Sequence, residues 1–140
     1  MTEDSRTGET EYVLTKDPAV LERAHTFCHA RGFDTTWMCF PTIIAIRDKK
    51  VVGVIGTQIV NDTIVAGPFV VELPGGHNGM VPYRLVEKYF TVMRNLGITE
   101  FYAFVDKDNL AYKKMLEALL EVEPFRFHED AWWYRIHPNE

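Results

Sequence analysis

The sequence is poor in several residue types and patterns, and each absence excludes a class of protein. Its single serine, Ser5, lies near the N-terminus, so a serine nucleophile is excluded. Two cysteines, Cys28 and Cys39, are too few for a disulfide framework and favour reduced thiols in an intracellular, cytoplasmic setting. No apolar run approaches the roughly 20 residues of a membrane span, so no membrane association is expected.

Positive charge is also scarce. The 140 residues include 15 Lys and Arg against 20 Asp and Glu, a formal net charge of −5. Proteins that coat nucleic acid need a basic surface, so no nucleic-acid partner is expected. The N-terminus is acidic and lacks an apolar segment, which argues against a secretory signal. We expect a flexible tail over residues 1–10 and a single domain over residues 11–140.

A metal site is not predicted either. His25 and His29 are one helical turn apart, with Cys28 between them. The chain has no HExxH glutamate and no third ligand at a recognisable spacing. Cys28 falls on the apolar stripe of the expected helix, so we favour a solvated helix face with a buried thiol.

The first half of the chain predicts a strand, a helix and two β-hairpins. A short alternating strand precedes Asp17 and Pro18, which are typical of a helix N-cap and first helical residue. The state of Phe33–Pro41 stays open. Short polar turns then separate three β-branched runs, which indicates an antiparallel meander. The runs are Thr42–Arg47, Val51–Val60 and Thr63–Leu73, and Pro68 in the third suggests a bulge or an edge.

The second half predicts two helices that alternate with strands. Met80–Leu96 carries an apolar helical stripe and is followed by Gly97, a typical helix stop. Phe101–Val105 reads as a buried strand, parallel to Thr63–Leu73. Asp108 is the expected N-cap of the next helix, whose inward residues would be Leu110, Met115, Leu116 and Leu119. A final hairpin over Pro124–His128 and Trp132–Ile136 sends Trp132 and Trp133 to opposite faces.

A glycine-rich loop, PGGHNG, lies between the meander and the first of these helices, at Pro74–Gly79. Free backbone N–H groups beside a helix N-terminus make an anion site suited to a pyrophosphate. The loop fits neither the GxxxxGK[ST] nor the GxGxxG pattern. A flexible connection whose glycines only permit the turn is the alternative.

The run from Thr42 to Phe127 resembles the GCN5-related N-acetyltransferase (GNAT) superfamily. The resemblance rests on the meander, the loop, the helix, the strand and then Asn109 before another helix. The family loop, [RQ]xxGx[GA], aligns with His77–Pro82, where His77 replaces the usual Arg or Gln. The resemblance implies a mixed α/β sheet in the order β-α-β-β-β-α-β-α-β-β, the acyl-CoA N-acyltransferase fold.

The resemblance also implies acetyl-CoA as cosubstrate, bound without a metal. The end of the meander would bind the pantetheine arm, the loop would bind the pyrophosphate, and Asn109 would contact pantetheine. The implied cofactor-binding residues are Val71, Leu73, Gly75, Gly76, His77, Asn78, Gly79, Met80 and Asn109.

Direct transfer of the acetyl group to an amine needs a base for the amine proton and an acid for the leaving thiolate. Glu72 and Tyr112 are the candidate catalytic residues. The family often carries a tyrosine about seven residues after the asparagine, where this chain has Leu116. The alternative, non-catalytic interpretations are that Glu72 is an exposed strand terminus and that Tyr112 is an aromatic residue on the helix surface.

Two functions therefore remain in view. The first is an acetyl-CoA-dependent N-acetyltransferase whose acceptor, a small-molecule or protein amine, is walled by Trp37–Phe40 near the end of the meander. The second is a non-catalytic GNAT-fold protein with a binding, regulatory or assembly role. The chain also resembles compact bacteriophage members, for which a virion location would follow. The C-terminal strands are a candidate homodimer interface.

Overall fold

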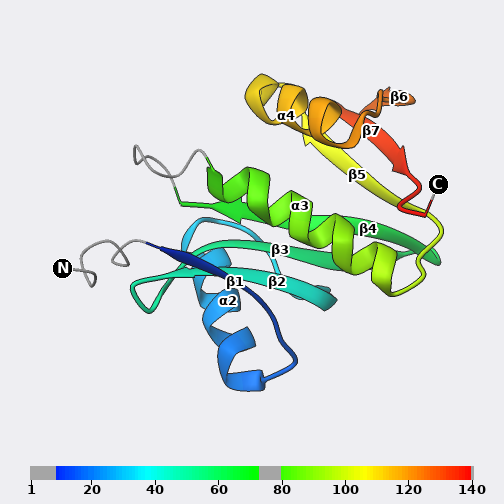
Figure 1. The fold of residues 1–140 in the computed structure, drawn as a ribbon. Helices are drawn as coiled ribbons and strands as arrows, with labels where there is room; N and C mark the ends of the chain where they lie inside the picture. Colours follow the sequence, from blue (N-terminus) through cyan, green and yellow to red (C-terminus); the bar gives the residue numbers. More distant parts are fainter. Residues whose placement is uncertain (1–8, 73–79, 140) are drawn as a thin grey trace.

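The computed structural model describes residues 9–72 and 80–139 (Figure 1). Within these ranges the elements follow the expected order. They are β1 (Thr10–Leu14), α2 (Pro18–Ala30), β2 (Cys39–Arg47), β3 (Lys50–Val60), β4 (Thr63–Val71), α3 (Met80–Asn95), β5 (Phe101–Asp106), α4 (Leu110–Leu120), β6 (Arg126–His128) and β7 (Ala131–Ile136). No helix in these ranges is long and apolar enough to cross a membrane.

The strands form one mixed sheet in the order β1-β2-β3-β4-β5-β7-β6. Neighbouring strands are antiparallel except β4 and β5, which are parallel and are connected through α3. The predicted mixed α/β sheet is therefore confirmed. β4 and β5 pair only at Val65 and Tyr102. Beyond this pair the strands separate toward their C-terminal ends, where α3 and α4 begin (Figure 1).

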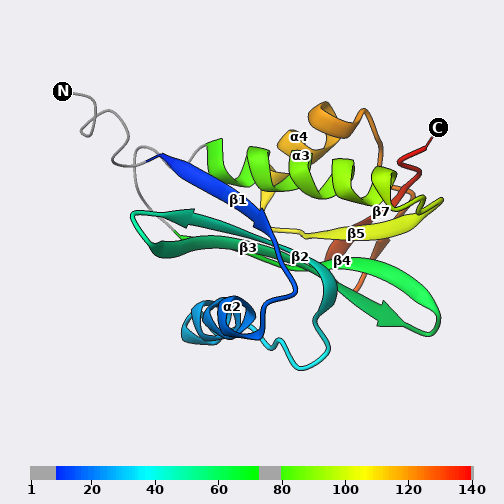
Figure 2. The ribbon, with the colours of Figure 1, turned by 60° about the horizontal axis from the view of Figure 1, so that its bottom comes forward.

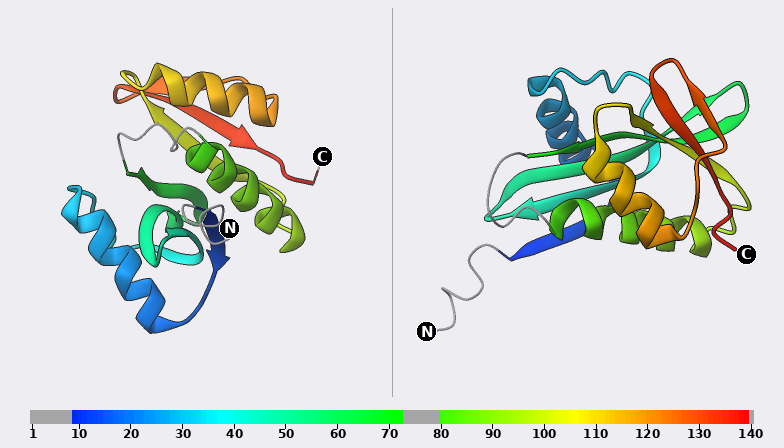
Figure 3. Two further views of the ribbon diagram at one scale, coloured as in Figure 1. Left: turned by 60° about the vertical axis from the view of Figure 1, so that its left-hand side comes forward. Right: turned by 90° about the horizontal axis from the view of Figure 1, so that it is seen from above.

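The helices lie on both faces of the sheet. α2 covers one face, and α3 and α4 lie on the other (Figures 2 and 3). α2 begins as predicted, because the Asp17 side chain accepts a hydrogen bond from Ala19 N at 3.0 Å and Pro18 opens the helix. Its buried residues Ala24, Phe27 and Cys28 pack on β2, β3 and β4. The predicted buried thiol of Cys28 is confirmed.

The centre of β3 is covered on both faces, which explains its continuous apolar run. Val52–Thr57 is buried throughout. Two glycines let its neighbours approach closely: a Cβ at Gly53 would lie 2.8 Å from Leu85 Cδ1 of α3, and one at Gly56 would lie 2.5 Å from Met38 Cγ. These contacts fix the height of α3 above one face and of the α2–β2 connection above the other.

Several local predictions differ from the structure. The N-cap of α4 is Asn109 rather than Asp108, because the Asn109 side chain accepts a hydrogen bond from Tyr112 N. Leu110, expected to face inward, is instead the first residue of α4 and is 56% exposed. The third meander strand ends at Val71. The bulge expected at Pro68 is confirmed by a register shift between β3 and β4.

Candidate functional site

The most distinctive feature of the fold is the wedge-shaped gap between β4 and β5. It begins at the Val65–Tyr102 pair and widens toward the end of the sheet where Asn109 follows β5. Two helix N-termini, those of α3 at Met80 and α4 at Leu110, flank its open end (Figure 1). Helix N-termini carry a partial positive charge and free N–H groups, so the open end favours an anion.

Along the gap, the facing edges of β4 and β5 do not form hydrogen-bonded pairs with each other. β4 pairs with β3 along its other edge, and β5 pairs with β7. Past Val65, no β4–β5 pair is formed within the described residues. Backbone N–H and C=O groups need hydrogen-bond partners, so these edges suit a ligand that carries amide groups.

The first turn of α4 positions two of the predicted residues together. Asn109 Oδ1 accepts a hydrogen bond from Tyr112 N at 3.2 Å. The amide nitrogen of Asn109 remains available as a donor on an exposed side chain. Asn109 thus caps the helix that carries Tyr112, and the two predicted residues share one structural unit.

The Tyr112 ring lies across the gap from β4. It stacks on Phe69 with ring centroids 4.7 Å apart and an interplanar angle of 27°. Both rings pack against the main core cluster, and both are half-buried. Beneath them, between α3 and α4, a crevice lined by residues such as Ala66, Ala103 and Tyr112 holds only about 10 Å³ of free space. The alternative of a surface aromatic is therefore wrong for Tyr112.

The environment of Tyr112 bears on proton transfer. Burial raises the pKa of Tyr112 well above its usual value, and the nearby Tyr89 raises it further. The phenol therefore keeps its proton at neutral pH, as a general acid must. Within the part of the chain that the structure describes, its hydroxyl makes no hydrogen bond.

Glu72, the other candidate, lies in a different environment. Its backbone N–H donates to Val52 O at 2.9 Å, and its carboxylate lies 3.5 Å from Arg31 at the C-terminal end of α2. Arg31 in turn lies over the Phe27 ring. Glu72 is therefore engaged on the α2 side of the sheet, whereas Tyr112 packs on the α3 and α4 side. The structure does not bring the two candidate catalytic side chains together.

The remaining predicted cofactor residues divide into two groups. Val71 closes β4 and packs against the core cluster beside α3, and Met80 is the exposed first residue of α3. The others lie outside the described residues: Leu73, Gly75, Gly76, His77, Asn78 and Gly79. Leu116, which stands where the family often has a tyrosine, is fully buried in the core.

A larger cavity of about 110 Å³ lies on the α2 face, at the opposite end of the sheet. Met38, Cys39 and Phe40 line it, whereas Trp37 is 74% exposed and lies outside it. Cys39 pairs with Thr57, far along β3 from the Val52 contact of Glu72. The expectation that the Trp37–Phe40 wall adjoins the end of the meander is therefore wrong, because the α2–β2 connection runs back along the helix.

The histidines of α2 hold that connection. The hydroxyl of Thr35, which is 1% exposed, lies 2.5 Å from His25 Nδ1 and 3.0 Å from His29 Nε2. The two histidines, one helical turn apart, therefore contact the same hydroxyl. No cluster of potential metal ligands occurs among the described residues.

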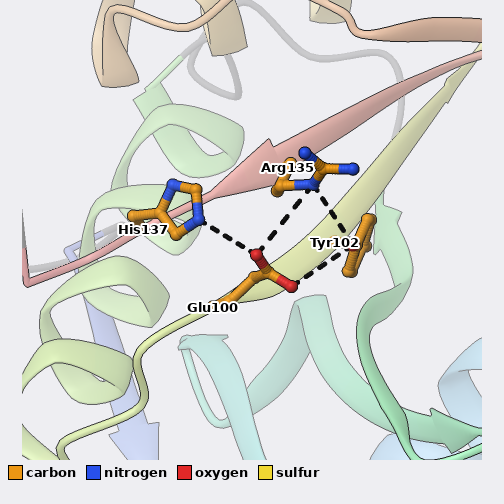
Figure 4. A network of polar contacts seen from close by, with 4 residues as sticks. All are labelled: Glu100, Tyr102, Arg135 and His137. Carbon is orange, nitrogen blue, oxygen red and sulfur yellow. Dashed lines mark hydrogen bonds and ion pairs between the residues drawn. The ribbon is translucent and has the colours of Figure 1, made fainter.

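A separate polar network joins the start of β5 to the end of β7 (Figure 4). Glu100 lies 3.0 Å from His137 Nε2 and 3.9 Å from Arg135 Nε, and Tyr102 donates to it at 3.2 Å. The network lies at the closed end of the gap, on the face opposite α3 and α4. It ties β5 to β7 and leaves the open end untouched.

Phe69 is the site residue that sequence reasoning missed. The bulge at Gly67 and Pro68 shifts the alternation of β4, so the inward direction of Phe69 does not follow from its position in the run. The unusual Gly-Pro pair before an aromatic residue was the available signal.

The fold matches those of known acetyltransferases. No protein-family model matches the sequence, and no curated protein sequence matches it. Among solved structures, the ribosomal-protein-S18-alanine N-acetyltransferase of Escherichia coli superposes with a TM-score of 0.68 at 13% identity, covering 94% of this chain and 96% of that one. PaiA N-acetyltransferase of Thermoplasma acidophilum, in complex with coenzyme A, gives 0.67 at 10% identity, covering 92% and 99%.

A further neighbour includes an acceptor. The diaminobutyrate acetyltransferase EctA of Paenibacillus lautus, in complex with L-2,4-diaminobutyric acid and coenzyme A, gives a TM-score of 0.68 at 14% identity and covers 95% of this chain and 97% of that one. An acetyltransferase of the GNAT family from Staphylococcus aureus gives the same score at 12% identity. The chain therefore has the fold of GNAT acetyltransferases. Sequence identities of 10–14% establish similarity of fold and not of function.

Proposed function

We propose that this protein is an acyl-CoA-dependent N-acyltransferase that transfers an acetyl group from acetyl-CoA directly to an amine. The observation that carries the proposal is the gap between β4 and β5, with two helix N-termini at its open end. Two of the neighbours that share this fold were solved with coenzyme A. The acceptor is a small-molecule or protein amine.

The chemistry of coenzyme A suits the gap. In the proposal, its pyrophosphate lies on the backbone N–H groups of Gly75–Met80, at the start of α3. Its pantetheine arm contains amides, which match the unpaired edges of β4 and β5. Val71 contributes backbone groups to the arm, and Asn109 donates from its side-chain amide.

Transfer requires two proton movements. The amine nitrogen forms a bond to the thioester carbon, the carbon–sulfur bond breaks, and the amine proton leaves to a base. In the proposal Glu72 accepts this proton and Tyr112 donates one to the leaving thiolate. Phe69, which contacts Tyr112, lies in β4, and Glu72 follows the end of that strand three residues later, about 10 Å further along the extended backbone and with its carboxylate toward α2. The acceptor and thioester must therefore bridge that distance near the open end.

Calorimetric titration with acetyl-CoA, followed by an assay of thiol release with a panel of amines, tests the proposal. Glu72→Gln keeps the shape and removes the proton acceptor, so turnover should fall about ten- to a thousand-fold with unchanged CoA affinity. A wild-type protein that binds no CoA would refute the proposal.

The second candidate function is a non-catalytic binding, regulatory or assembly role on the same fold. It is favoured by one observation: the aromatic stack of Phe69 and Tyr112 leaves little free space in the gap. Binding of acetyl-CoA without acetylation of any amine in the panel would favour this function over the first.

The proposed setting is the cytoplasm, and the proposed homodimer forms through the C-terminal strands. β6 is an edge strand whose three residues are all exposed, so a second copy can pair with it. Sedimentation of the wild type beside a Phe127→Pro variant, which removes an edge N–H donor, tests the dimer. Identical monomeric behaviour of both proteins would refute it.

A further inference from the structure

We propose that the Phe69–Tyr112 stack is a gate across the gap: stacked rings close the gap, and the pantetheine arm enters only when the two rings separate. This inference rests on the proposed function, because it concerns the same site. It identifies Tyr112 and Phe69 as the residues that control entry of the thioester into the gap between β4 and β5.

The first support is the position of the rings. Phe69 projects from β4 and Tyr112 from α4, so their contact connects the two sides of the gap past its last ladder pair. The stacked geometry, with centroids at 4.7 Å, leaves no layer between the rings. An arm that runs along the edge of β4 from α3 meets this contact before it reaches the Val65–Tyr102 pair.

The second support is the space behind the rings. The crevice lined by Ala66, Ala103 and Tyr112 holds about 10 Å³, roughly one water molecule. Its walls come from both helices and from both strands, and Tyr112 is the wall residue that also belongs to the stack, so displacement of its ring enlarges the crevice. The wall residues Ala66 and Ala103 have small side chains.

The third support is the Tyr112 hydroxyl, which makes no hydrogen bond among the described residues. The other tyrosines of this core are anchored: Tyr89 lies 2.7 Å from Thr57 Oγ1, and Tyr134 donates to Glu117 at 2.7 Å. Only ring packing therefore holds Tyr112 in place. Rotation of its side chain breaks no hydrogen bond to the described residues, so only the loss of ring packing opposes it.

A closed gate lowers the apparent affinity by the fraction of open molecules. The stacking free energy of one aromatic pair can change the ratio of open to closed molecules by up to about ten-fold. Removal of either ring should therefore tighten CoA binding by about that factor and speed association. Tyr112→Phe keeps the stack, so it should bind CoA as the wild type does.

The experiment is calorimetric titration of CoA into the wild type, Tyr112→Ala, Tyr112→Phe and Phe69→Ala, each with folding checked by circular dichroism. Phe127→Ala is the matched control, because it removes a ring from another aromatic pair, with Trp132 at 5.5 Å, on the edge strand β6. We expect tighter binding in Tyr112→Ala and Phe69→Ala only. If Tyr112→Ala does not fold, Phe69→Ala alone decides.

The outcomes separate the gate from the proposed function. If the wild type and both truncated variants bind CoA equally, the function stands and the gate is refuted. If only the truncated variants bind, the gate is supported and transfer by the native chain is refuted. If no protein binds CoA, the proposed function is refuted, and the gate with it.

Discussion

The hydroxyls of Thr57 and Tyr89 lie 2.7 Å apart beneath α3, and Thr57 also donates to the carbonyl oxygen of Pro41 at 2.7 Å. Because a hydroxyl donates only once, Tyr89 must donate to Thr57. The pair joins α3 to β3 and to the start of β2 in a part of the core that contains few other polar groups.

Replacement of one partner should therefore cost more than replacement of both. Thr57→Val leaves the buried hydroxyl of Tyr89 without an acceptor and should lower the free energy of unfolding by about 1–3 kcal/mol. The double variant Thr57→Val/Tyr89→Phe should recover part of that loss. Urea unfolding of the two variants and Tyr89→Phe gives the coupling energy, and strictly additive losses would contradict the assigned pairing.

Glu117 should make stability depend on pH. Hydrogen bonds from Lys113 and then from Tyr134 lower the pKa of Glu117. A carboxyl with a lowered folded pKa stabilises the fold above its unfolded pKa of about 4.3, and the contribution is lost as pH falls through the folded pKa. Glu117→Gln should therefore lower the free energy of unfolding at pH 7. This loss relative to the wild type should shrink as the pH falls below about 4.

Urea unfolding of Glu117→Gln at several pH values measures this effect. The matched control is Glu87→Gln, which removes an exposed ion pair with Arg84 and should change stability little at any pH. A stability difference for Glu117→Gln that is constant from pH 7 to acid would show that the carboxylate charge plays no part.

The two glycines of β3 should respond differently to alanine. At Gly53 the added Cβ meets Leu85 Cδ1 at 2.8 Å and Val81 Cγ1 at 3.2 Å, both in the packed core. Overpacking there should cost about 1–3 kcal/mol. At Gly56 the obstacle is Met38, a flexible and only half-buried side chain, so the cost should be smaller. Thermal unfolding compares them, and equal losses would contradict this explanation.

Asn109 should have two separable roles. Asn109→Ala removes the helix cap and should lower the free energy of unfolding by about 1 kcal/mol. Asn109→Ser keeps a capping oxygen but lacks the amide donor, so stability should be retained. Under the proposed function both variants bind CoA more weakly. Calorimetry of CoA binding and urea unfolding of the same variants separate the two roles. Full CoA affinity in Asn109→Ser would show that the side-chain amide does not contribute to CoA binding.

Much of the fold follows from local patterns in the sequence. Asp17 and Pro18 place the start of α2, and the polar turns fix the meander, because turn chemistry and periodicity act over a few residues. Asn109 and Asp108 show the limit: both can cap a helix, and only the geometry after β5 selects Asn109.

The candidate site was less predictable, because it depends on contacts between distant residues. The Phe69–Tyr112 stack joins residues from separate elements, and the ion pair of Glu72 with Arg31 spans 41 positions. No periodicity within one segment reports such contacts. The resemblance identified the elements that surround the gap, but it did not predict that Phe69 and Tyr112 meet across it.

The single ladder position between β4 and β5 divides the sheet into two plates. One plate is β1 to β4 with α2, and the other is β5 to β7 with α4; they are joined at Val65 and Tyr102, by the Phe69–Tyr112 stack and by packing against α3. Each plate keeps its own hydrogen bonds when the angle between the plates changes. Under the proposed function, we therefore expect a molecule bound between the plates to act as a spacer that changes the angle between their far edges, β1 and β6.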